Sequence, residues 1–114
     1  MGLQLAVRHV GDVVIIDLQG KATMGRANDN LNSQLRQLID DGTSKILVNL
    51  TDVTQLDSSS ISTIVRAFVS LRNRGASLKL LRPRPNVRLV LETLHLLDAI
   101  PIAEDEAQAI SSFR

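Results

Sequence analysis

The chain alternates between two kinds of apolar pattern, and this alternation constrains its fold more than any other feature. Residues 13–18 and 45–50 are almost continuously apolar and rich in β-branched side chains, as in the strands of a buried sheet. After each of these runs, apolar residues recur every three or four positions, which is the period of an amphipathic helix. Strands separated by helices are joined by right-handed crossovers and pair in parallel. The pattern therefore predicts an α/β fold with helices packed on a sheet.

The first two predicted strands differ from the others because a short turn joins them. Residues 3–8 alternate apolar and polar side chains, and Gly11-Asp12 separates them from the run at 13–18. These two strands are expected to form an antiparallel hairpin. Further strands are predicted at 45–50 and 77–81, with a short extended piece at 100–102. We therefore expect a mixed sheet of four to five strands in which only the first runs against the others.

About four helices are expected to cover this sheet. Apolar stripes of helical period lie within residues 27–39, 61–71 and 87–97, and residues 104–113 begin with acidic side chains that favour a helix N-terminus. Asp57 or Ser58 is a suitable N-cap, and Gly42 and Gly75 are suited to end the first and second helices. Residues 20–25 and 52–57 are predicted as loops. Because no linker or repeat interrupts the pattern, residues 1–114 are expected to form a single domain.

Charge and composition argue against several classes of partner. The formal net charge is +1 and aromatic residues make up 2% of the chain, so neither a basic field nor stacking platforms for nucleic acid are expected. No apolar run approaches the 18 or so residues that span a bilayer, and the first ten residues do not resemble a signal peptide. A cytoplasmic protein with no membrane contact is expected. A small basic cluster of Arg82, Arg84 and Arg88 is interpreted as solvated surface.

Catalytic and metal sites find little support in the residue types present. The two histidines, His9 and His95, do not stand beside a serine in any nucleophile motif, and His95 is expected to face Asp98 on the third helix as a surface contact. The chain has no cysteine, and no glycine-rich phosphate-binding pattern is present. We expect no enzymatic activity, no metal and no cofactor.

One polar run stands out between the third predicted strand and the second helix. Asp57, Ser58, Ser59 and Ser60 place a carboxylate and three hydroxyls at a strand-to-helix turn, where functional groups collect in α/β sheets. One interpretation is a helix cap, since Asp and Ser are preferred there, although one capping residue is sufficient. The other is a phosphate-acceptor serine, since a phosphate would add about −1.5 to −2 charges and change the surface while leaving the fold intact.

Five segments of the chain, taken together in order and spacing, resemble the STAS family, the domain of sulfate transporters and anti-sigma factor antagonists. These segments are residues 18–25, 45–53, 57–61, 72–81 and 104–107. The resemblance covers essentially the whole chain. It implies a STAS fold of four or five strands with helices on one side.

The resemblance also implies a role, that of an anti-sigma factor antagonist in a bacterial partner switch. In such a switch the unphosphorylated antagonist binds an anti-sigma factor that is also a serine kinase, which frees a sigma factor for transcription. Phosphorylation of a serine of the antagonist makes the complex dissociate, and a phosphatase then removes the phosphate. By the motif, the acceptor in this chain is Ser59, with Ser60 and Ser58 as the alternatives. The implied partner-binding residues are Asp57, Ser58, Ser59, Ser60, Ile61, Thr23 and Met24.

The chain departs from the family pattern at two positions. Ser60 stands where the motif usually has glycine, so a side chain lies where a partner would approach the backbone. Thr23 stands where some members carry an acidic residue. The alternative role implied by the family is a constitutive accessory subunit of an ABC transporter ATPase or of a signalling assembly. A weak homodimer through a sheet edge is also expected.

Overall fold

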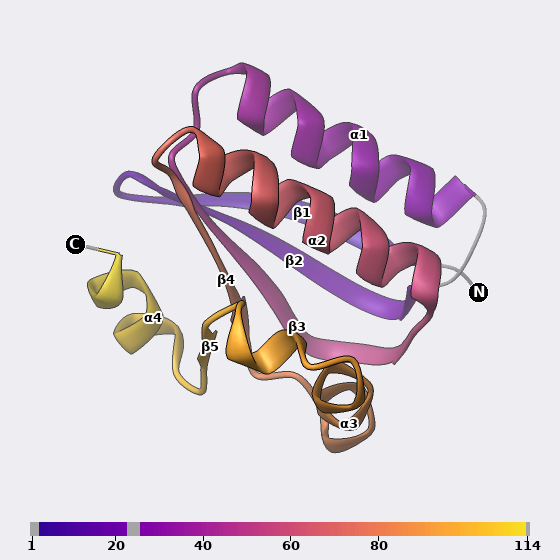
Figure 1. The fold of residues 1–114 in the computed structure, drawn as a ribbon. Coiled ribbons are helices and arrows are strands. Elements are labelled where there is room, and N and C mark those ends of the chain that lie inside the picture. The colour runs from indigo at the N-terminus through magenta and orange to yellow at the C-terminus, as the bar shows by residue number, and fades with distance from the viewer. Residues whose placement is uncertain (1–2, 23–25, 114) are drawn as a thin grey trace.

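The computed structural model describes residues 3–22 and 26–113, and within them five strands form one sheet in the order β1-β2-β3-β4-β5 (Figure 1). The strands are β1 (Gln4–Val10), β2 (Val13–Ala22), β3 (Lys45–Leu56), β4 (Ser77–Leu81) and β5 (Ile102–Ala103). The helices are α1 (Arg26–Asp40), α2 (Ser58–Asn73), α3 (Pro85–Thr93) and α4 (Glu106–Ser112), with a 3-10 turn η1 (Leu96–Asp98). Strand β1 is antiparallel to β2, and every other neighbouring pair is parallel. The predicted mixed sheet is confirmed.

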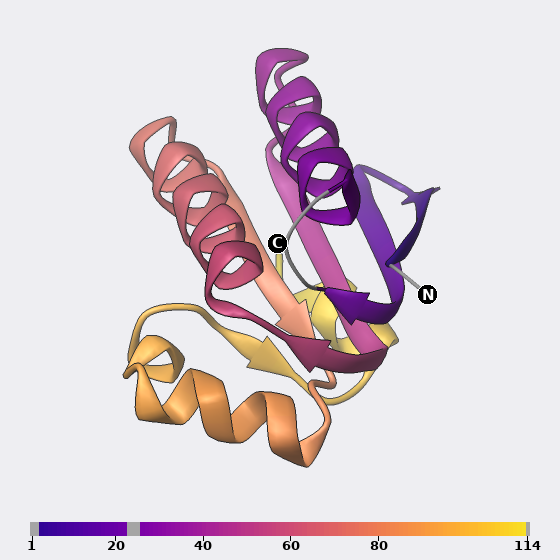
Figure 2. The same ribbon diagram turned by 90° about the vertical axis from the view of Figure 1, so that its right-hand side faces the viewer.

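Helices α1 and α2 lie side by side on one face of the sheet (Figures 1 and 2). Successive residues of a strand point to opposite faces, so one alternate set from each strand meets these helices. Ile16, Val48 and Leu80 supply this set from β2, β3 and β4, and each is at most 1% exposed. They pack in one cluster with Leu35 of α1 and Leu71 of α2. The main core therefore lies between the sheet and the two long helices.

Helix α4 covers part of the opposite face, so the expectation of helices on one side is wrong (Figure 1). The other alternate set of strand residues forms a second, smaller cluster with Ala109 of α4. Its strand members are Val13, Ile15, Leu47 and Leu81. Because these side chains are apolar, leaving this face bare would expose them to water, and α4 prevents this.

A polar network attaches α4 to the hairpin. Arg8 of β1 forms ion pairs with Asp17 of β2 and with Glu106 of α4. The side-chain amide of Asn49 on β3 donates a 2.8 Å hydrogen bond to the same Asp17 carboxylate. The hydrogen bond from Arg8 is the main cause that lowers the pKa of Asp17 below its ordinary value, against the opposing effect of partial burial, and Asn49 adds to it. This network links β1, β2, β3 and α4.

The structure corrects the predicted loops at 20–25 and 52–57. Strand β3 runs to Leu56 and pairs with β2 as far as Ala22, with irregularities in the register after Asp17 and after Gly20. Val53 and Leu56 are buried, and their burial holds this polar extension against the core. The irregularities allow the strand to continue where strict alternation of side chains fails. The extension carries the chain directly to the start of α2.

The third helix ends earlier than its apolar stripe predicts. Helix α3 stops at Thr93, because His95 adopts a left-handed conformation with φ 59°. That conformation cannot continue a right-handed helix. The chain turns instead through η1 and buries Ile100, while Leu94 remains 49% exposed. The predicted helical pair of His95 and Asp98 is therefore wrong.

Candidate functional site

The candidate site lies where β3 ends and α2 begins. Strands β2, β3 and β4 are parallel, so the segments that follow their carboxyl ends share one edge of the sheet. This edge is the usual position of functional groups in α/β folds. Asp57 joins β3 to α2 in an extended conformation, with φ −93° and ψ 176°, as an N-cap residue should.

One oxygen of the Asp57 carboxylate holds two neighbours. Its Oδ1 accepts a 3.0 Å hydrogen bond from the backbone amide of Ser60 and a 2.9 Å hydrogen bond from the hydroxyl of Ser59. The first bond satisfies one of the amides that every helix leaves unpaired in its first turn. The second fixes the direction of the Ser59 hydroxyl. The predicted cap at Asp57 is therefore present, and the cap also orients the proposed acceptor.

The three serines of the run have different environments. Ser58 is exposed and Ser59 is half-buried, whereas Ser60 is fully buried, with 0% of its surface exposed. Ile61 is also interior, at 5% exposed. Because of this burial, the Ser60 hydroxyl cannot meet a kinase without the start of α2 opening, and neither Ser60 nor Ile61 offers a side-chain surface to a partner. Their expected roles as alternative acceptor and as contacts are not supported by this geometry.

The two remaining expected contacts, Thr23 and Met24, lie outside the described residues. The last described residue before them, Ala22, pairs with Leu56 at the end of β3.

The start of α3 contacts the extension of β3 through hydrogen bonds that sequence analysis did not predict. Arg84 Nε donates a 3.0 Å hydrogen bond to the carbonyl of Thr51, and the Asn86 amide donates a 2.8 Å bond to the carbonyl of Thr54. Both bonds join residues more than thirty positions apart, so no local pattern could reveal them. Arg84 remains exposed, as the solvated-surface interpretation requires, but it also fixes the strand that leads into the site.

His9 lies far from Ser59 in this fold. His9 pairs with Val14, whose partner on β3 is Ile46, while Ser59 follows Leu56 at the other end of that strand. The strand rise places His9 roughly 30 Å from Ser59, which excludes it as a general base there. Within residues 3–22 and 26–113, no group of three His, Asp or Glu side chains could hold a metal ion.

The comparison with protein families decides the assignment. The model of the STAS domain matches residues 4–109. The chain belongs to the STAS domain family. This match includes every strand of the sheet and the Asp57-Ser58-Ser59 run at the start of α2. The family suggested by the sequence motifs is thereby confirmed.

Solved structures share the fold of this STAS domain. An anti-sigma factor antagonist of Thermotoga maritima is 25% identical, with 96% of this chain and 94% of that chain covered and a TM-score of 0.84. SpoIIAA of Bacillus in its phosphorylated form is 23% identical, covering 97% and 100%, with a TM-score of 0.79. An anti-sigma factor antagonist from Mycobacterium paratuberculosis is 16% identical, covering 98% and 94%, with a TM-score of 0.89. No curated protein sequence matches the chain.

In the part of the chain that the structure describes, no helix has both the length and the apolar character needed to cross a membrane.

Proposed function

We propose that this STAS domain is an anti-sigma factor antagonist that works in the bacterial cytoplasm as a partner switch. In its unphosphorylated state it binds an anti-sigma factor with serine kinase activity. The kinase transfers phosphate to Ser59, and the complex separates. The observation that carries this proposal is the half-buried Ser59 hydroxyl held by the cap carboxylate of Asp57 at 2.9 Å. The similarity of this chain to the Thermotoga maritima antagonist supports the same general role.

The chemistry is a phosphoryl transfer from ATP bound to the kinase. The Ser59 oxygen forms a bond to the γ-phosphorus, the bond from that phosphorus to the ADP oxygen breaks, and the serine proton leaves to a base. The hydrogen bond that Ser59 donates to Asp57 leaves the lone pairs of its oxygen available for attack. This STAS domain supplies the acceptor, and the partner supplies the catalytic machinery.

The phosphate acts as a switch because of its position beside Asp57. Once esterified, the Ser59 oxygen has no proton, so its bond to the Asp57 carboxylate is lost and two negative groups face each other. The free amides and the dipole at the start of α2 offset part of this repulsion, so the fold persists. The surface presented to the partner changes, and a phosphatase restores it.

The proposed contact surface is the sheet edge around this helix start. Asp57, Ser58 and Ser59 form its core, and Thr23 and Met24 are proposed as further partner contacts. Ser60 acts from the interior by filling the space beneath the helix start.

Strand β1 lies at one edge of the sheet and pairs only with β2 among the described strands, so we place the proposed weak homodimer at that strand.

Mass spectrometry of the protein purified from its own cells tests the switch. We expect phosphate on Ser59 in a fraction of molecules that changes with growth condition. A phosphate on Ser60 would overturn the residue assignment. If no condition yields any phosphate, the partner switch is wrong and the chain acts as a constitutive subunit, such as a partner of an ABC transporter ATPase. A pull-down would then recover that ATPase.

A further inference from the structure

A groove between α1 and α2 differs in character from the surface around Ser59. Its volume is about 420 Å³, which lies within the range of small-molecule sites. The base of the groove is apolar and formed by Leu35, Ile39 and Ala67, each at most 7% exposed. The floor of the groove is therefore apolar and consists of residues of the main core.

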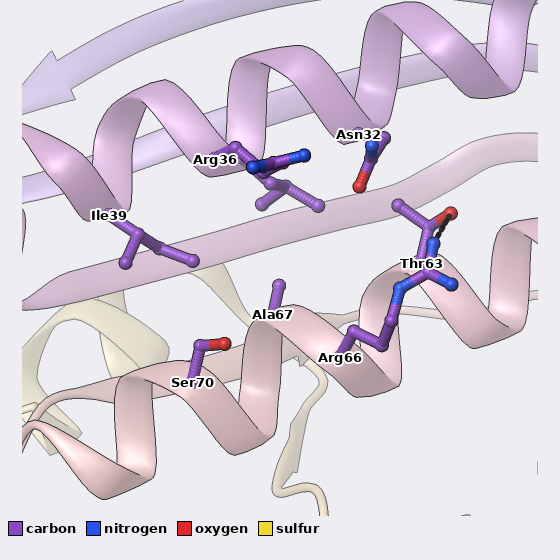
Figure 3. Close-up of a pocket in the computed structure, with 8 residues that line it drawn as sticks. Asn32, Arg36, Ile39, Thr63, Arg66, Ala67 and Ser70 are labelled. Carbon is purple, nitrogen blue, oxygen red and sulfur yellow. Dashed lines mark hydrogen bonds between the residues drawn. The ribbon is translucent and has the colours of Figure 1, made fainter.

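The walls of the groove carry hydrogen-bond donors from both helices. Figure 3 shows Asn32 and Arg36 on α1 and Arg66 and Thr63 on α2 facing the same opening, with Ser70 further along α2. Among the described residues, none that lines this groove is acidic. Two guanidinium groups thus stand on opposite walls together with neutral amide and hydroxyl groups.

Neither Arg36 nor Arg66 forms an ion pair with a carboxylate of the residues that the structure describes. Arg36 forms no ion pair with any described residue, although it also lines a second hollow together with Asp40 and Asp41. The hydrogen bond of Arg66 is a long one, 3.4 Å to the hydroxyl of Thr63. Other arginines of the chain, such as Arg8 and Arg88, are neutralised by acidic side chains. The charge in the groove is therefore available to a ligand.

We propose that the groove between α1 and α2 binds a small phosphate monoester through Arg36 and Arg66. A single planar guanidinium fork can saturate the two oxygens of a carboxylate. Two forks on opposite walls suit a tetrahedral dianion, whose oxygens face both sides. Asn32 and Ser70 supply further polar contacts, and the apolar floor takes the carbon part of the ester. Ligand binding at this site does not require phosphorylation of Ser59.

The groove is connected to the acceptor along one face of α2. Ser59, Thr63, Arg66 and Ser70 follow each other at intervals of three and four residues, so they form one stripe of the helix. Thr63 Oγ1 donates a 3.0 Å hydrogen bond to the Ser59 carbonyl and accepts the bond from Arg66. A ligand that draws Arg66 away from Thr63 therefore alters a contact within the first turns of α2.

The experiment is a titration of the unphosphorylated chain followed by amide NMR shifts, with inorganic phosphate and glycerol 3-phosphate as probes. We expect saturable shifts at the groove residues below about 10 mM, with glycerol 3-phosphate binding more tightly. Arg36→Gln and Arg66→Gln should each weaken binding about tenfold, the loss of a charge-assisted contact. The matched control is Arg72→Gln, an exposed arginine of α2 outside the groove, which should bind as the unaltered chain does.

Three results would overturn the site. The first is a set of shifts that never saturate, and the second is the same shifts in sodium chloride at equal ionic strength. The third is unchanged affinity in both groove variants. Each would show that the groove has no specific binding site for the ligand. Tighter binding of inorganic phosphate than of the ester would contradict the proposed ligand class. The amide spectra of the two variants report their folding directly, and the variants lie on different helices. Failure here leaves the proposal for Ser59 untouched, because that proposal rests on phosphorylation in cells.

Discussion

The Ser59 hydroxyl donates to the Asp57 carboxylate at 2.9 Å, and the same carboxylate oxygen caps α2 by accepting from the amide one residue further on. The acceptor of the proposed switch is therefore oriented by the residue that also begins the helix. A change in one function of Asp57 affects the other, which makes this pair the natural target for mutation.

Substitutions at Ser59 should separate binding from release. Ser59→Ala leaves the bond from the Ser60 amide to Asp57 in place, so we expect stability within about 1 kcal/mol of the unaltered chain and full binding of the kinase partner without release. Ser59→Asp places a charge beside Asp57 and should weaken that binding. Calorimetric titration with the cognate kinase measures both. The control is Ser111→Asp, at an exposed position of α4 away from the proposed contact surface, which should bind as the unaltered chain does. Tight binding by Ser59→Asp would refute the switch.

Removing the cap should cost stability at the helix start. Asp57→Ala deletes the acceptor for both Ser59 and the Ser60 amide, and we expect the free energy of unfolding to fall by about 0.5–2 kcal/mol. Urea unfolding followed by circular dichroism measures the change. Asp52→Ala serves as the control, because that side chain is 64% exposed and lies 4.0 Å from Arg84, so its loss should cost less than about 0.5 kcal/mol. Equal losses in the two variants would contradict the capping role.

The same substitution at adjacent serines should have unequal effects. Ser60 is fully buried, so Ser60→Asp forces a charge into the core and should destabilise the fold by about 2 kcal/mol or more beyond Ser59→Asp. Thermal unfolding of the two variants, compared with the alanine variants at each position, tests this. Similar melting temperatures for the two aspartate variants would show that the Ser60 side chain reaches solvent.

The link between Arg8 and Asp17 should make part of the stability depend on pH. The pKa of Asp17 is lowered in the folded state, so its contribution is fully present above the unfolded pKa of about 3.9 and is lost as the pH falls towards the folded value. Asp17→Asn should therefore be less stable than the unaltered chain at pH 7, and the difference should shrink below about pH 4. Urea unfolding across this range measures it. Arg8→Gln should reduce the same acid sensitivity, and a profile unchanged by either variant would refute the coupling.

Much of the fold follows from local sequence patterns. The predictions that were wrong concern segments whose structure depends on contacts distant in sequence. The runs at 13–18 and 45–50 and the helical stripes depend on side chains close in sequence, and so does the cap at Asp57. The extension of β3 through Asp52 and Thr54 was predicted as a loop because these residues are polar. What makes it a strand is pairing with β2 and bracing from α3, and neither is visible locally.

Some features of the candidate site could likewise be predicted from local sequence, whereas others depend on tertiary packing. The motif identifies Asp57 and Ser59, but the burial of Ser60 depends on how α2 settles against the sheet. The groove around Arg36 and Arg66 requires two helices to be placed side by side. The distance between two helices is set by tertiary packing. The apolar period of a single segment does not predict it.

The late position of α4 in the chain has a consequence for synthesis. The apolar face formed by Val13, Ile15, Leu47 and Leu81 is complete once β4 has left the ribosome, but its cover ends at Ser112. At about 5–20 residues per second, roughly 30 residues more take about 2–6 seconds. During that interval the nascent chain displays this face to its surroundings, so chaperones and other nascent chains compete with α4 for it.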